Sequence, residues 1–179
     1  MNAARALPQP EIRRAVAADL PALKALVESA YRGESAKGGW THEAHLLTGE
    51  RVSMAELAAN VAAPAMRVLV AEAADGALLA TMTVSAPTAP GQPAYLAMLA
   101  VAPGAQAGGL GRRMIAACEA AAARELGASA CEMSVIASRH ELIAYYQRRG
   151  YRLTGEQRPF PYAEGAAAGL VLVVLERQL

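Results

Sequence analysis

Residues 101–113 read VAPGAQAGGLGRR and gather four glycines, one glutamine and two arginines in a chain otherwise rich in alanine and leucine. The stretch continues a near-continuous apolar segment, residues 93–103, and leads into an amphipathic one, residues 110–127. This arrangement predicts a buried strand, a glycine-rich loop and the first turn of a helix. What the loop can hold therefore decides what the chain does.

Two familiar phosphate-binding motifs do not fit this loop. A P-loop requires a lysine where the chain has Leu110. A dinucleotide-binding fingerprint requires a glycine where the chain has Met114. The loop therefore belongs to neither class.

The pattern that remains is Gln106-x-x-Gly109-x-Gly111. Glycines allow a ligand to approach the backbone closely. The free N–H groups of a helix's first turn, together with the helix dipole, favour an anion there. The pattern thus indicates a place for a diphosphate, with Arg112 and Arg113 adding charge at its rim. A helix start with flexible glycines and no ligand is the alternative.

The whole chain of 179 residues predicts a flexible lead, residues 1–10, and a single domain, residues 11–179. Its 17 basic and 16 acidic residues nearly cancel, which argues against a nucleic-acid partner. No apolar run approaches the roughly 18 residues of a membrane span, and the first residues lack the build of a secretion signal. Cys118 and Cys131 lack disulfide or metal spacing, so we expect small buried residues of a cytoplasmic protein.

Hydrophobic periodicity predicts the remaining elements. Strands are expected at residues 11–16, 66–73, 77–87, 93–103, 129–137, 151–157 and 169–179. Helices are expected at residues 19–33, 42–47, 53–63, 110–127 and 138–150, the last opened by Ser138. Ser53 and Gly127 stand where an N-cap and a C-terminal cap belong. The order predicts an α/β (α+β) domain with a mixed sheet.

Two segments resemble the motifs of one enzyme family. VAPGAQAGGLGRRM, which follows YLAMLA, is similar to the [QR]xxGx[GA] motif of the GCN5-related N-acetyltransferase (GNAT) superfamily. ELIAYYQRRGY, residues 141–151, resembles the family's later segment, where a tyrosine, here Tyr146, precedes a glycine–aromatic pair by four residues. Over residues 11–179 the resemblance implies a mostly antiparallel sheet with a splayed parallel strand pair and helices on both faces.

The resemblance also implies acetyl-CoA as cosubstrate and no metal. The pantetheine arm would lie where residues 98–101 splay from residues 133–136, and main-chain N–H groups near Leu99 and Val101 would polarise the thioester carbonyl. Arg139 stands where the family often has asparagine, and could reach the cofactor or solvent. The implied cofactor-binding residues are Met98, Leu99, Ala100, Val101, Gln106, Ala107, Gly108, Gly109, Leu110, Gly111, Arg112, Arg113 and Arg139.

In this family the acceptor amine attacks the thioester directly, without an acyl-enzyme. Tyr146 occupies the position of the general acid, and a phenol with a pKa of about 10 is protonated at neutral pH. A core aromatic is the alternative for Tyr146 and the expectation for Tyr145. Residues 94–101 include no acidic side chain, so the base is unassigned. The candidates are Glu34, Glu43, Glu132 and a backbone-bound water.

The resemblance places the acceptor pocket near the first helix and the loop after it. Tyr31 and Trp40 would form apolar walls there, although Trp40 could instead pin the loop to the core. Glu34 or Glu43 would hold a cationic amine. The HEAH run, residues 42–45, has histidines three apart rather than the four of a zinc protease helix, which favours surface histidines.

The function predicted is transfer of an acetyl group from acetyl-CoA to a primary amine of a small molecule or a peptide. A module that binds acyl-CoA as a sensor without catalysis is the main alternative, and a transferase of another short acyl group is a third. A homodimer is a further possibility, because the apolar residues 170–175 could lie at a subunit contact.

Overall fold

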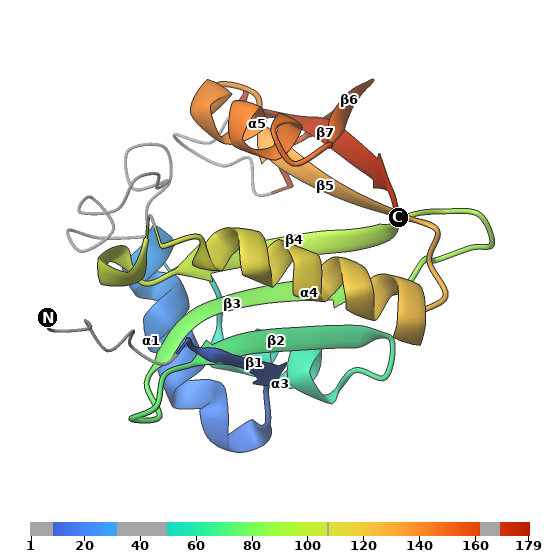
Figure 1. The fold of residues 1–179 in the computed structure, drawn as a ribbon. Helices are drawn as coiled ribbons and strands as arrows, with labels where there is room; N and C mark the ends of the chain where they lie inside the picture. Colours follow the sequence, from blue (N-terminus) through green and yellow to red (C-terminus); the bar gives the residue numbers. More distant parts are fainter. Residues whose placement is uncertain (1–8, 32–49, 107, 162–168) are drawn as a thin grey trace, which may run out of the picture.

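The computed structural model describes residues 9–31, 50–106, 108–161 and 169–179, arranged around one seven-stranded sheet (Figure 1). The strands are β1 Glu11–Arg14, β2 Met66–Glu72, β3 Leu78–Ser85, β4 Ala94–Val101, β5 Ala130–Ile136, β6 Arg152–Pro159 and β7 Val171–Gln178. The helices are α1 Leu20–Tyr31, α3 Met54–Ala62, α4 Leu110–Glu125 and α5 His140–Gln147, with short 3-10 turns at Ala17–Asp19 and Pro103–Ala105. The helix predicted at residues 42–47 lies outside the described residues; the other predicted elements are confirmed.

The strand order is β1-β2-β3-β4-β5-β7-β6. Neighbouring strands are antiparallel except β4 and β5, which are parallel. The predicted mixed, mostly antiparallel sheet is thus confirmed. Strand β7 lies between β5 and β6, and burial there accounts for part of the apolar run at residues 170–175: Val174 and Leu175 are buried, whereas Val171 is exposed. The edges of this strand are therefore not open to a second subunit.

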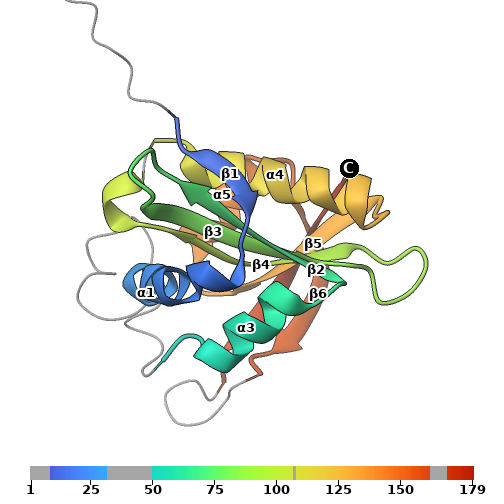
Figure 2. The ribbon, with the colours of Figure 1, turned by 90° about the horizontal axis from the view of Figure 1, so that it is seen from below.

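Helices cover both faces of the sheet (Figure 2). Met114 of α4 and Tyr146 of α5 pack on one face in a core that also contains Leu175, here called the α4-side core. Leu23 of α1 and Leu57 of α3 pack on the other face in a second core, the α1-side core. The β4–β5 junction lies between these layers, so a separation of these two strands has a helix layer on each side.

The two cysteines lie free and buried in the α4-side core, as expected. Burial raises the pKa of both thiols, that of Cys131 to about 12. A thiol is nucleophilic as its thiolate, so neither cysteine is placed to react at neutral pH.

Local signals fix most helix ends. The Ser53 hydroxyl accepts a hydrogen bond from the Glu56 N–H at 3.1 Å, as an N-cap does. Gly127, with φ 66°, follows the end of α4 in the left-handed conformation predicted for a cap. The predicted start of α5 at Ser138 is wrong by two residues. The Arg139 N–H donates to the Ile136 carbonyl, so Ser138 lies in a turn after β5.

Two carboxylates of α4 tie this helix to different strands. Glu119 accepts hydrogen bonds from the Tyr151 hydroxyl at 2.7 Å and from Arg177 of β7 at 3.0 Å. Glu125 pairs with Arg14 of β1 and with Arg67 of β2. The Glu119 side chain is 12% exposed and the Glu125 side chain 38% exposed. The helix therefore joins both ends of the sheet, and the better-buried tie is to the C-terminal strands.

Candidate functional site

The parallel strands β4 and β5 pair over a short distance and then separate. Their register joins Ala94 to Cys131 and Tyr95 to Glu132, and no later residue of β4 is paired with β5. Figure 1 shows the two strands diverging toward α5 and the start of α4. Residues 98–101 and 133–136 lie beyond the paired part, so the predicted splayed pair is confirmed.

A β-bulge in β4 coincides with this separation. Thr81 of β3 pairs with Ala100 and Thr83 pairs with Ala97, so Met82 alone faces both Met98 and Leu99. Met98 has φ 54°, and it is the one non-glycine residue of the described ranges with a positive φ. A bulge bends its strand and leaves one residue outside the ladder. The bend therefore accounts for the departure of β4 from β5.

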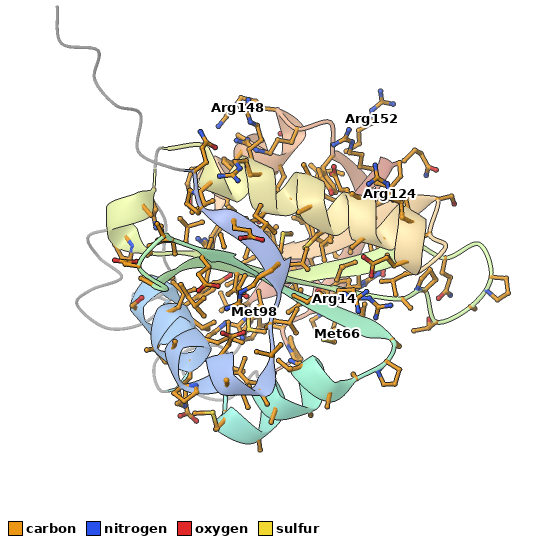
Figure 3. The ribbon with its side chains drawn as sticks, turned by 60° about the horizontal axis from the view of Figure 1, so that its bottom comes forward. Arg14, Met66, Met98, Arg124, Arg148 and Arg152 are labelled. Atoms are coloured by element: carbon orange, nitrogen blue, oxygen red, sulfur yellow. The ribbon has the colours of Figure 1, made fainter. Side chains whose placement is uncertain are left out.

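The Met98 side chain packs against the α1-side core, on the sheet face that carries α1 (Figure 3). Residues 97–99 are half-buried although the strand is uniformly apolar. The exposure follows from the opening beside them. Main-chain groups of this part of β4 therefore border the separation between the strands.

The Val101 backbone faces the opening. The Ala102 N–H donates to the Leu79 carbonyl at 2.8 Å, and hydrogen-bonded pairs alternate with non-bonded pairs in an antiparallel ladder. The Val101–Ala80 pair is therefore a non-bonded one, with the Val101 N–H and carbonyl turned away from β3. The Gln106 side-chain amide donates to that carbonyl at 3.1 Å. The Val101 N–H therefore lies on the side of β4 that faces away from β3.

The loop before α4 ends in a residue that must be glycine. Gly109 has φ 76° and occupies the N-cap of α4, where it has no side chain to cap the first turn. A Cβ built on it would meet nothing within 4 Å, so its surroundings are open. The first helical hydrogen bond runs from the Arg113 N–H to the Gly109 carbonyl. The N–H groups of residues 110–112, the first turn of α4, thus have no partner within the helix; Ala107 lies outside the described residues.

Gly111 lies against helix α5. A Cβ on Gly111 would lie 2.8 Å from the Tyr145 hydroxyl, so the missing side chain makes room for this phenol. Arg113 departs from the expected rim position, because its guanidinium donates to the Pro10 carbonyl at 2.7 Å. Arg112 is exposed. Of the two arginines, Arg112 alone is free to face an anion at the helix start.

Helix α5 contributes two adjacent tyrosines, of which Tyr145 reaches the start of α4 with its hydroxyl beside Gly111. Tyr146 is 6% exposed and contacts the rings of Tyr145 and Tyr151 edge to face, with centroids 5.4 Å and 6.1 Å away. Burial, and then the neighbouring Tyr31 phenol, raises the pKa of Tyr146 above its ordinary value. Arg149 stacks on the Tyr145 ring, 3.2 Å from its centroid. The Tyr146 phenol is therefore protonated and neutral throughout the physiological range.

Tyr31, expected as an apolar wall, makes a polar contact with the bulge. Its hydroxyl donates to the Leu99 carbonyl at 2.6 Å, and the Arg51 guanidinium lies 5.0 Å from the centre of its ring. Sequence reasoning did not detect the Tyr31–Leu99 bond.

Arg139 is 6% exposed and stands at the N-cap of α5, just beyond the end of β5, with its Nε 3.7 Å from Glu141.

Glu132 is the one base candidate within the described residues. It lies opposite Tyr95 in the closed part of the β4–β5 pair, and its two carboxylate oxygens accept from Arg158 at 2.9 and 3.2 Å. Beside it the Tyr95 and Ser134 hydroxyls are hydrogen-bonded at 2.5 Å, across the fork where the strands part. Taking up an amine proton on Glu132 would disturb the pair with Arg158.

Several expectations fall outside the described residues. Trp40, Glu34, Glu43 and the HEAH run are in the segment 32–49, of which no structure is described. Within the described ranges, no group of three or more histidine, cysteine or acidic side chains is placed to hold a metal ion. None of the helices in those ranges is long and apolar enough to cross a membrane.

Comparison with known proteins gives one family. Its model, described as the acetyltransferase (GNAT) family, matches residues 26–151. No curated protein matches the chain. A ribosomal-protein-alanine N-acetyltransferase from Brucella melitensis is similar in structure, with a TM-score of 0.69 and 22% identity over 94% of this chain and 99% of that one.

Two further solved structures share the fold. YncA from Salmonella typhimurium, solved with its cofactor acetyl-CoA, has a TM-score of 0.68 and 19% identity over 96% of this chain and 95% of that one. A spermidine N-acetyltransferase chimera from Vibrio cholerae SpeG and hSSAT has a TM-score of 0.72 and 15% identity, covering 96% of each chain. At these identities the likeness concerns the fold.

Proposed function

Because the chain belongs to the acetyltransferase (GNAT) family and is thus an N-acetyltransferase, we propose that it uses acetyl-CoA to acetylate a primary amine between β4 and β5. The observation that carries the proposal is the strand separation at the bulge, which opens beside the glycine-capped start of α4. Main-chain donors can polarise a thioester carbonyl and a helix start can bind a diphosphate, and both features are adjacent here.

The proposed cofactor site has two parts. Residues 98–101 would contact the pantetheine arm, with the outward Val101 N–H as one donor. The outward N–H groups after Gly109 would hold the diphosphate, and exposed Arg112 would add charge. We exclude Arg113 from the anion contacts because it is bonded to Pro10. The open space at Gly109 fits a group that approaches the backbone closely.

The proposed chemistry forms one C–N bond and breaks one C–S bond. The neutral amine nitrogen attacks the thioester carbonyl carbon, and main-chain N–H groups of β4 stabilise the oxyanion that develops. When the intermediate collapses, Tyr146 donates its hydroxyl proton to the departing thiolate sulfur. The amine proton passes to a base, for which Glu34, Glu43, Glu132 and a bound water remain candidates.

The acceptor is proposed to be a small-molecule or peptide amine. The named relatives act on a ribosomal-protein alanine and on spermidine, so a panel should contain an alanine-starting peptide, spermidine and free amino acids. Release of free thiol from acetyl-CoA with any of them supports transfer. Binding of acetyl-CoA without thiol release across the panel would favour the sensor alternative, and faster release from propionyl- or succinyl-CoA would favour another acyl donor.

Thermal unfolding with and without acetyl-CoA is the first test. At about a hundred times its dissociation constant, a ligand specific for the folded state adds about 2.7 kcal/mol. For a chain of this size the unfolding midpoint should rise by about 5 to 10 °C. No rise at saturating acetyl-CoA would overturn the proposed site.

A further inference from the structure

The Tyr31 hydroxyl joins the end of α1 to the bulge in β4. It donates to the Leu99 carbonyl at 2.6 Å, across 68 positions of sequence. Tyr31 is the last residue of α1, and Leu99 is one of the two bulge residues opposite Met82. This bond therefore connects the α1 layer to the backbone that borders the strand separation.

The Leu99 carbonyl faces away from β3. Ala100 pairs with Thr81 two positions before the bonded Ala102–Leu79 pair, so the Ala100 N–H is directed to β3 and the Leu99 carbonyl of the same peptide to the other side. Strand β5 does not pair with β4 beyond Tyr95, so it offers no replacement. A half-buried carbonyl is stabilised by a donor, and the phenol of Tyr31 supplies one.

The same bond constrains a strained backbone. Met98 has φ 54°, a conformation that is unfavourable for a non-glycine residue and persists only where its surroundings enforce it. Ala100 is fixed on one side by its pairing with Thr81. Tyr31 fixes the Leu99 carbonyl between them. The Leu99–Ala100 peptide is thus held by β3 on one side and by Tyr31 on the other.

Tyr31 itself is held in place. The Arg51 guanidinium lies 5.0 Å from its ring centre, and Glu28 accepts from the N–H groups of Arg51 and Val52 at 2.8 and 3.2 Å. The Tyr31 phenol is also close enough to Tyr146 to influence its titration. The Tyr31 phenol therefore contacts the bulge and also influences the proposed general acid electrostatically.

We propose that Tyr31 is a positioning residue, which holds the Leu99 peptide so that the N–H groups of the bulged strand face the thioester carbonyl. The inference rests on the proposed function and adds a residue to it. Tyr31 acts through Leu99 and does not touch the reacting atoms. Its loss should weaken oxyanion stabilisation while leaving the diphosphate site at α4 intact.

The test compares Tyr31→Phe with Tyr151→Phe. Both variants remove one phenolic hydrogen bond, but the Tyr151 bond to Glu119 lies in the α4-side core. Four quantities are measured: the acetyl-CoA dissociation constant, the carbonyl stretch of bound acetyl-CoA labelled with ¹³C at the thioester carbon, and the kcat and KM with the fastest amine of the panel.

Tyr31→Phe should bind acetyl-CoA within about twofold of the wild type, with kcat lower by about tenfold, less than the loss of a whole oxyanion donor. The carbonyl stretch of the bound thioester should move toward its value in water, because polarisation is reduced. Tyr151→Phe should keep the wild-type kcat and stretch.

Three outcomes would overturn the inference. An unchanged kcat and stretch in Tyr31→Phe is one, and a raised KM for the amine at unchanged kcat, which marks a substrate wall, is another. If Tyr31→Phe does not fold, a variant with 4-aminophenylalanine at position 31 is used instead, because it restores an N–H donor. The third outcome is that this variant retains less than half of the shift of the thioester carbonyl stretch, relative to water, that the wild type shows. Absence of acetyl-CoA binding by the wild type would instead refute the proposed function itself.

Discussion

The strands β1–β4 and the strands β5–β7 form two antiparallel halves that differ in how they are held. In the first half each strand pairs along its length, and helices α1, α3 and α4 cover both faces. The second half has its own ladder, in which β7 pairs on both sides. Between the halves, backbone pairing is limited to Ala94 with Cys131 and Tyr95 with Glu132. The candidate site thus lies where the sheet is least continuous.

Side chains compensate for this weak junction. The α4-side core contains residues of both halves, from Leu69 to Leu175. Glu119 of α4 bonds Tyr151 and Arg177, which belong to the second half. The halves are therefore joined through helix α4 and kept apart along β4. Separation is local, and the remainder of the interface is packed.

The largest expected effect comes from removing the acid that the second half contributes. Tyr146→Phe should lower turnover by about 10²- to 10⁴-fold while acetyl-CoA affinity stays nearly unchanged, because the proton for the thiolate is lost. Steady-state thiol release and calorimetric binding measure the two quantities. Tyr145→Phe is the matched variant, and a larger loss there than in Tyr146→Phe would exchange their roles.

The same tyrosine predicts the alkaline side of the pH profile. Burial raises the pKa of Tyr146, so the hydroxyl stays protonated as the pH rises through the ordinary phenol value of about 10. Deprotonation of Tyr146 should therefore not lower the kcat of the wild type between pH 8 and about pH 10. A fall in kcat below pH 9 that disappears in Tyr146→Phe would contradict the assignment.

The next largest effect concerns the glycine that ends the loop of the first half. Gly109→Val should weaken acetyl-CoA binding at least about a hundredfold, because a branched side chain occupies the space where the diphosphate approaches. Gly91→Val is the control, since Gly91 also has a positive φ and open surroundings but lies in the β3–β4 connection. If both variants lose the same stability but only Gly109→Val loses acetyl-CoA binding, the diphosphate lies at Gly109. If both variants bind acetyl-CoA equally well, the diphosphate does not lie at this loop.

The smallest effect tests the tie between the halves. Glu119→Ala leaves the Tyr151 hydroxyl and Arg177 without their shared partner and should lower the free energy of unfolding by about 2 to 3 kcal/mol. Glu125→Ala removes a more exposed pair to β1 and β2 and should cost about 1 kcal/mol or less. Urea denaturation compares them, and an equal loss would show that α4 holds both halves alike.

Sequence patterns were sufficient for the elements and for the loop. The strand periods, the Ser53 cap and the glycine stretch depend on neighbours in sequence, and the structure confirms the elements they predict. The splayed pair was expected from family resemblance. The apolar strand itself gives no sign of it, because residues 97–99 are as apolar as the buried residues around them.

What the sequence could not predict are contacts between distant residues. The Tyr31–Leu99 bond and the Glu132–Arg158 pair join positions 68 and 26 residues apart. The Tyr145 hydroxyl uses the space that Gly111 leaves. Arg113 was expected at the rim, whereas it is bonded to Pro10. Each depends on where the fold brings two segments together, which periodicity does not record.

The position of β7 has a consequence for biosynthesis. This strand follows β6 in the chain but is inserted between β5 and β6 in the sheet. On the ribosome, β1–β4 can assemble while the rest is still being made, whereas β5 has no second neighbour until β7 has emerged. One wall of the opening is therefore completed late, so a chain released before β7 would carry the glycine loop and α4 but no finished site.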